Sequence, residues 1–328
     1  MLGNEADGLA IDFTDLSMVI RDTTTPANNF VGDPNAKLTY ASPSTKWVRN
    51  RAGVLVSGTA LRTEYDLSGN ALGVRLEEQR TNLFLNSRVP ATQNVTVSAV
   101  AYTLSFFGTG SITRSGTSSG TLSGTGADDR VSVTFTPTAG TLTLTVSGTI
   151  DFVQLEAGPS ATSPIVTSGA SVTRVIDALS IAQSLFPASV PGTIVLGYRL
   201  LALVTTTAQT AAVLYSSGSN VVSMLANNTA GSFGATITTS GAGQGFNDIV
   251  GVSANANVKQ AFAFATNSSA HVAKGGSPVT DSTVNLPVVD TLRLGINLFG
   301  ANSLNGHIRQ ALVLPRRMSN AELQAITT

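Results

Sequence analysis

The chain has 328 residues, no cysteine, and 19 basic against 19 acidic residues, so its formal net charge is zero. The lack of cysteine excludes a disulfide framework and a thiolate metal site, and the lack of clustered Lys and Arg argues against nucleic acid as a partner. Only 12% of the residues are charged while 42% are hydrophobic. This balance argues against disorder and favours a folded chain whose weakly charged surface is covered by assembly.

The N-terminal sequence predicts neither a signal peptide nor a membrane segment. Residues 1–13 read MLGNEADGLAIDF and lack the basic and apolar regions of a secretory signal. No apolar run approaches the ~20 residues that a membrane helix needs. We therefore expect synthesis in the cytoplasm without a signal peptide, and no insertion into a membrane.

Residues 1–88 are predicted to form an N-terminal attachment or oligomerisation segment of short strands with little core of its own. A strand is expected at Leu9–Phe13, and the Pro-, Asn- and Gly-containing stretch Thr25–Pro34 predicts a loop. Short strands and turns alternate from Trp47 to Ser87. Trp47 is the only tryptophan, and burial in the core or at a subunit interface is expected before stacking on a sugar, because single tryptophans usually pack.

Residues 89–172 are predicted to form a small jelly-roll β-sandwich. Between residues 101 and 150, 21 of 50 residues are Ser or Thr, and Thr suits strands through its branched Cβ. Apolar and polar residues alternate strictly in Val131–Phe135 and again in Leu142–Val146, which is the period of half-buried strands. An antiparallel sandwich with Gly, Ser and Thr turns is the expected result.

Residues 173–328 are predicted to form a second, larger β-sandwich. Alternating runs at Leu292–Ile296 and Ile308–Val313 predict strands on either side of a Gly/Asn turn. The chain then ends in a short helix beginning near Ser319, because Ser319 followed by Glu322 has the spacing of a capping box. Further strands are expected at 191–198, 213–215, 221–225, 235–238 and 258–264.

Three stretches resemble one family of proteins. Residues 73–87 read GVRLEEQRTNLFLNS, which resembles a recurring N-terminal module of phage tail-fibre, head-fibre and related virion proteins. Residues 151–174 contain VQLEAG, ATSPI and VTR, and they resemble the closing strand of carbohydrate-binding-module-like jelly rolls in the same proteins. The C-terminal pattern LRLG, PRR and SNAEL is similar to the end of concanavalin-A-like (laminin-G-like) jelly rolls of tailed bacteriophages.

The resemblance implies an all-β chain of tandem antiparallel β-sandwich (jelly-roll) domains with an N-terminal attachment segment and a short C-terminal helix. It also implies a structural virion protein, a fibre, spike or decoration subunit on the virion surface that contacts host surface polysaccharide. Its expected partners are copies of itself, as a homotrimer, and capsid or tail proteins bound through residues 1–88. A depolymerase spike and a capsid-cementing protein without a receptor remain alternatives.

The ionisable residues predict no enzyme active site. The neighbours Glu77 and Glu78 would point to opposite faces of a strand, as would Asp128 and Asp129, whereas glycoside hydrolysis needs two carboxylates facing one bond. Ion pairs with Arg75, Arg80 or Arg130 are expected instead. His271 and His307 lie far apart in sequence, and His307 is expected in a turn or at the surface. We therefore expect no catalytic residue, no cofactor and no metal.

Glycan binding is the chemistry that the C-terminal domain best suits. Sugar sites combine an aromatic ring for the apolar face of the sugar with amide or carboxylate groups for its hydroxyls. Calcium is not expected, because it prefers several carboxylate ligands and few are present. All of the candidate residues are expected in loops, and the competing interpretation is that they are ordinary polar loop residues. The candidates are Asn247, Asp248, His271, Asn297, Phe299 and Asn302.

Overall fold

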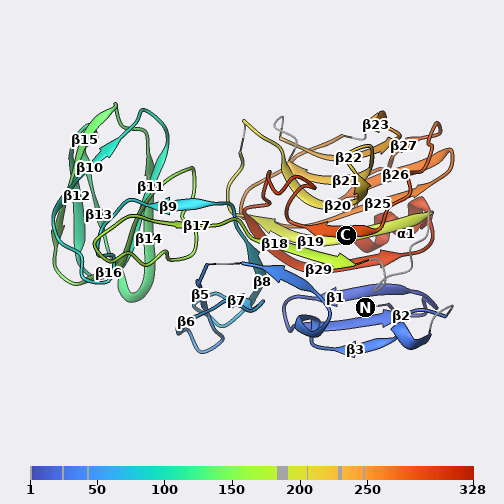
Figure 1. Ribbon diagram of the computed structural model, residues 1–328, viewed down its shortest axis with the longest axis horizontal. Helices are drawn as coiled ribbons and strands as arrows, with labels where there is room; N and C mark the ends of the chain where they lie inside the picture. The colour runs from blue at the N-terminus through green and yellow to red at the C-terminus, as the bar shows by residue number, and fades with distance from the viewer. Residues whose placement is uncertain are drawn as a thin grey trace.

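The computed structural model describes residues 2–23, 26–42, 44–182, 191–204, 206–227, 231–246 and 248–328. Figure 1 shows a smaller and a larger β-sandwich side by side, with the single α-helix of the described residues near the C-terminus. The predicted fold class is confirmed: the chain is built of antiparallel sheets in tandem sandwiches. No helix among these residues is long and apolar enough to span a membrane.

The larger sandwich pairs a ten-stranded sheet with an eight-stranded sheet. The first sheet runs in the order β27 (Val279–Asp281), β26 (Ser268–Ala273), β25 (Asn257–Ala265), β19 (Gly192–Leu200), β29 (Gly306–Leu314), β1 (Gly8–Asp12), β2 (Ser17–Arg21) and β3 (Phe30–Gly32), with β8 (Ala71–Leu76) pairing with β29 and β7 (Thr63–Tyr65). The second runs in the order β23 (Ala242–Phe246), β22 (Ser232–Thr239), β21 (Asn220–Asn227), β20 (Gln209–Ser217), β28 (Thr291–Leu294), β18 (Ala178–Ala182) and β4 (Thr39–Ala41), with β24 (Ile249–Val250) on β22.

Alternation along the strands builds the core of the larger sandwich. Ile194 and Leu196 of β19 join Leu292 and Leu294 of β28 in one buried cluster, as the period of two requires. The opposite face of β19 is buried too, because Val195 packs in a second cluster beneath the C-terminal helix. Strands buried on both faces lose the polar alternation of a half-exposed strand.

The C-terminal helix α1 (Asn320–Thr327) begins where the sequence predicted. Ser319 accepts a hydrogen bond from the backbone N–H of Glu322, and the Glu322 carboxylate accepts one from the Ser319 N–H, which completes the capping box. Arg316 holds the same carboxylate at 2.8 Å. Leu323 of the helix is fully buried against the ten-stranded sheet, so the helix is docked.

The smaller sandwich stacks a four-stranded sheet on a three-stranded sheet. Its core is one apolar cluster that includes Phe84, Leu104, Phe106 and Leu142. The strands lie within the region 89–172 in which a small jelly roll was expected. They are β10 (Gln93–Val97), β15 (Gly140–Ser147), β12 (Ser111–Gly116) and β13 (Gly120–Ser123) in one sheet, and β14 (Gly126–Phe135), β11 (Tyr102–Gly108) and β16 (Ile150–Ala157) in the other.

The N-terminal strands belong to the larger sandwich. Leu9 and Ile11 of β1 lie in register with Val313 and Ala311 of β29, and both side chains are buried in its core. The stretch expected to be a loop contains the short edge strand β3. Residues 1–88 therefore do not form a separate unit, because the apolar residues of β1 and β2 need the C-terminal sheet to be buried.

One short sheet connects the sandwiches, and a second lies beside it. The strands β9 (Arg80–Asn82) and β17 (Val172–Arg174) pair between the two bodies, and the hairpin of β5 (Lys46–Arg49) and β6 (Leu55–Gly58) lies beside this connection (Figure 1). Asn82 ties the connection to the smaller sandwich: its amide donates to the carbonyls of Val153 and Ile165, while its Oδ1 accepts from Leu155 N.

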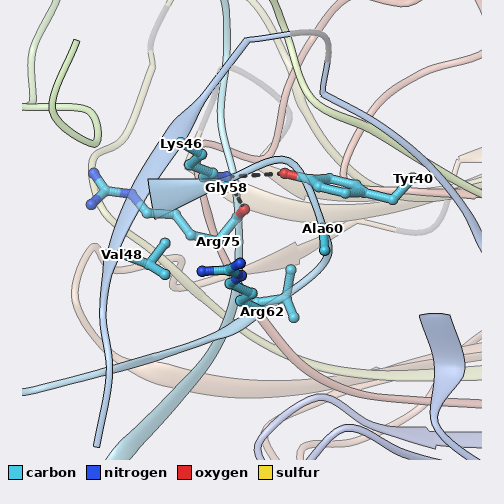
Figure 2. Close-up of a pocket in the computed structure, with 8 residues that line it drawn as sticks. Tyr40, Lys46, Val48, Gly58, Ala60, Arg62 and Arg75 are labelled. Atoms are coloured by element: carbon cyan, nitrogen blue, oxygen red, sulfur yellow. Dashed lines mark hydrogen bonds between the residues drawn. The ribbon is translucent and has the colours of Figure 1, made fainter. Parts of the chain in front are cut away.

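A buried ionic network fills this junction. Glu77, fully buried, lies 2.7 Å from the Arg75 Nε and also contacts Arg174 and Lys46. Lys46 in turn contacts Asp177, and Figure 2 shows its amine reaching the hydroxyl of Tyr40 and the carbonyl oxygen of Arg75. Burial lowers the pKa of the Lys46 amine, but Asp177 and Glu77 more than offset this, so the pKa is raised.

The predicted ion pairs of the carboxylate doublets are confirmed in part. Glu77 pairs with Arg75 and Glu78 with Arg80. Arg130 instead donates to the carbonyl of Thr162 and the hydroxyl of Ser105, so the prediction is wrong for Arg130. Its guanidinium is turned inward, where burial lowers its pKa to about 10.

The prediction for His307 is wrong as well. His307 is 2% exposed and lies in β29, and its Nε2 is 2.7 Å from Glu64 Oε2. Burial lowers the pKa of this imidazole more than Glu64 raises it. Because a carboxylate accepts hydrogen bonds, Nε2–H is the donor to Glu64. Burial raises the pKa of Glu64, yet Arg75 and His307 reverse this and leave it at about 2.

Candidate functional site

The groove that best suits a ligand lies where the β5–β6 hairpin meets the smaller sandwich. It has a volume of about 580 Å³, and Trp47, Phe107 and Phe152 line it together with Arg49 and Arg88. The hollow drawn in Figure 2, by contrast, has a volume of about 10 Å³, which leaves room for one water at most. Of the two, only the first can hold a small organic ligand.

Three aromatic rings form the wall of the groove. Trp47 follows the buried Lys46 on β5, and its ring is half-buried rather than packed in the core. Its centroid lies 4.9 Å from that of Phe152 in an edge-to-face arrangement, and Phe152 is 5.9 Å from Phe107 in the same way. Such contacts fix ring orientations, so the wall is held in shape without a ligand.

Phe152 is placed by an irregularity in β16. The register of β11 against β16 shifts between Ser105, which pairs with Gln154, and Phe107, which pairs with Asp151. An advance of two residues along β11 therefore matches three residues along β16. Phe152 lies in this bulge with a φ of +49°, a left-handed conformation that costs of order 1–3 kcal/mol outside glycine. Bulges of this kind redirect side chains, and here the redirected ring meets Trp47.

Charged groups form the rim of the groove. The Arg88 guanidinium lies 3.9 Å from the centroid of the Phe152 ring, and its Nε is 2.7 Å from Asp151 Oδ1. The side chains of Arg88 and Asp151 are 44% and 39% exposed, so both can also meet a ligand. Arg49 donates to the carbonyls of Gly53 and Asp128. Phe107 and Phe152 are 4% and 7% exposed, so Trp47 is the ring of this wall on which a ligand can stack. Donors and acceptors of hydrogen bonds lie beside it.

The residues predicted from sequence as glycan ligands are divided between several places. His271 was expected in a loop, but it is fully buried in β26, where its Nε2 lies 2.9 Å from the Gln260 amide. The prediction is therefore wrong for His271, which no ligand can reach. Asn247 lies outside the described residues. Asp248 is exposed and lies beside Gly234 of β22.

Three of the six candidates share the loop between β28 and β29. Asn297 Oδ1 accepts from the N–H groups of Phe299 and Ala301 and so holds the turn together. Phe299 is 78% exposed beside Gly218, and Asn302 lines a hollow of about 270 Å³. This loop offers an exposed ring, but without the surrounding wall of the Trp47 groove.

The groove is not among the sites predicted from the sequence. The sequence predicts a Trp47 buried in the core or at a subunit interface, and nothing in the pattern of β16 marks Phe152 as a bulge residue. No cluster of three or more His, Asp or Glu able to hold a metal occurs in the described part of the chain. What the groove can do chemically is to stack against an apolar face and exchange hydrogen bonds at its edge.

No known protein family and no curated protein matches this chain. Among solved structures, it is similar to the CBM40 module of the Ruminococcus gnavus IT-sialidase bound to α2,3-sialyllactose, with 19% identity, a TM-score of 0.36, and coverage of 42% of this chain and 83% of that chain. It is also similar to domain 4 of an extracellular arabinanase from Geobacillus stearothermophilus in complex with arabinotriose, with 11% identity, a TM-score of 0.40, and coverage of 48% and 77%. Chicken galectin 2 gives 14% identity, a TM-score of 0.22, and coverage of 39% and 86%.

Proposed function

We propose that the chain is a non-enzymatic glycan-binding protein and that the Trp47 groove is its saccharide site. The observation that carries the proposal is the half-buried ring of Trp47 in a preformed aromatic wall, with Arg88 and Asp151 at its rim. Sugars present C–H faces that stack on such rings and hydroxyls that bond to such a rim. The strained backbone at Phe152 supports the proposal, because strain concentrates at functional sites.

Replacing Trp47 with Ala is expected to weaken saccharide binding by about tenfold or more, or about 1.4 kcal/mol. The binding is measured on a glycan array with the purified full chain, and then by titration. Phe299→Ala is the matched control, since Phe299 is the exposed ring of the other candidate location. Trp47→Phe keeps an aromatic ring and should retain part of the affinity.

A loss of binding in Phe299→Ala with normal binding in Trp47→Ala would contradict the groove and favour the β28–β29 loop. Binding by neither wild type nor variants would contradict the function itself. A reducing-sugar assay on any polysaccharide bound tests the alternative of a depolymerase, because hydrolysis would release new ends while simple binding would not.

The biological setting that we propose is the surface of a tailed-phage virion, as a fibre, spike or decoration subunit meeting host polysaccharide. The support is the resemblance of residues 73–87 and 151–174 to such proteins. The capsid-cementing alternative predicts binding to particles and none to cells. Labelled protein added to host cells before and after removal of their polysaccharide separates the two.

We also propose self-association, as a homotrimer. The strand β3 is at the edge of the ten-stranded sheet, and its Val31 is 81% exposed; an uncovered edge strand is a template for another chain. Sedimentation at micromolar concentration is expected to give the mass of a trimer, with Val31→Lys shifting it toward monomer. A stable monomer of the wild type would contradict this prediction.

A further inference from the structure

The indole of Trp47 borders a second groove as well as the first. The second groove has a volume of about 440 Å³ and is lined by Ile165, Val166, Val172 and Thr173 among others. Among the residues that the structure describes, Trp47 alone lines both grooves. A single ring therefore lies between two hollows, each within the size range of small-ligand sites.

The two hollows differ in chemistry. Two cations, Arg49 and Arg88, and two carboxylates, Asp128 and Asp151, line the first groove, so its charges sum to zero. Arg88 and Asp151 also pair there at 2.7 Å. The second is apolar and hydroxylated: Val166 and Val172 are 37% and 39% exposed, and the hydroxyl of Thr173 lies 2.7 Å from that of Thr81. Arg174 also lines it, but its guanidinium is buried against Glu77. Neither hollow holds a charge that calls for an oppositely charged ligand.

We propose that the two grooves form one extended site for a linear, uncharged oligosaccharide, which runs from one groove to the other across Trp47. This inference rests on the proposed function and adds the length and charge of the ligand. A longer oligosaccharide that binds through its internal sugar units fills both grooves, while a disaccharide fills only one. Affinity should therefore rise with chain length until both grooves are occupied.

The test uses the full chain and the fluorescence of its single tryptophan, which reports directly on the site. Malto-, cello-, xylo- and arabino-oligosaccharides are titrated as dimers, tetramers and hexamers. For the series that binds, we expect the hexamer to bind about tenfold or more tighter than the dimer, and added salt to change the affinity little because neutral ligands are not screened.

Thr173→Phe fills the second groove and should reduce hexamer affinity about tenfold while leaving dimer affinity unchanged. Thr121→Phe is the matched control, since Thr121 forms the same kind of exposed cross-strand hydroxyl pair with Thr113, at 3.0 Å on β12 and β13. Equal affinities for dimer and hexamer, or no effect of Thr173→Phe, would overturn the extended site while leaving the saccharide function intact. No fluorescence response to any series would overturn both.

Discussion

Replacing Glu77 with Gln is expected to lower the free energy of unfolding by about 3–5 kcal/mol, the usual cost of removing one partner from a buried ion pair. Three cations and three carboxylates are joined in the junction network: Lys46, Arg75, Arg174, Glu64, Glu77 and Asp177. Glu77 contacts all three cations and is fully buried. A neutral amide at this position leaves an excess positive charge out of contact with water, and denaturant unfolding measures the loss.

The neighbouring Glu78 provides the control. It pairs with Arg80 and its side chain is 28% exposed, so Glu78→Gln should cost about 0–1 kcal/mol, the value of a partly exposed pair. Equal costs for the two variants would mean that the network does not hold the junction together.

The pH dependence of unfolding gives a second measurement on the same variant. Burial raises the pKa of Glu77, but Arg174, Arg75 and Lys46 outweigh it and hold the pKa well below its ordinary value of 4.5. A carboxylate with a depressed folded-state pKa stabilises the fold above its unfolded pKa and stops doing so as the pH falls through the folded pKa. The wild type should therefore lose stability below about pH 4.5, and Glu77→Gln should lose less.

The sequence predicted individual strands well because alternation is a local property. Val131–Phe135 and Leu142–Val146 lie within β14 and β15, and the capping box at Ser319 begins the helix. The pairing of strands is not local. The pattern of β1 is the same whether it joins an N-terminal unit or β29, and only the register of Leu9 with Val313 decides between them.

The candidate site was harder to predict for the same reason. A histidine within a strand pattern suggests an exposed position, yet His307 is buried because Glu64, 243 positions away, accepts its hydrogen bond. Trp47 lies half-buried in a groove that it shares with residues distant in sequence, such as Phe152. The sequence shows aromatic and charged residues near Trp47 and near Phe152. That these two stretches lie close together depends on tertiary packing.

The stretch with the clearest resemblance, residues 73–87, has a structural role that explains its pattern. Arg75 and Glu77 belong to the junction network, Asn82 hydrogen-bonds to the smaller sandwich, and Phe84 enters the core of that sandwich. These residues join two domains and do not line the Trp47 groove. The motif therefore specifies how the sandwiches are connected, while ligand choice depends on residues outside it.

Gly73→Val, at the start of that motif, is expected to lower the free energy of unfolding by about 3 kcal/mol or more. Gly73 has a φ of +104°, and a Cβ there would lie 2.3 Å from the carbonyl oxygen of Ile308. Both the backbone strain, about 1–2 kcal/mol, and the forced separation of β8 from β29, about 1–3 kcal/mol, oppose the substitution. Denaturant unfolding measures the change.

Gly243→Ala is the control for Gly73→Val, because Gly243 also lies in a strand but has open space where its Cβ would be. Its effect should stay within about 0.5 kcal/mol. If the two variants unfold alike, β8 does not approach β29 closely. If Gly73→Val alone is destabilised and also binds saccharide as the wild type does at low temperature, then the glycine serves the junction and the groove is independent of it. Loss of binding in a folded Gly73→Val would instead mean that β8 positions the hairpin that carries Trp47.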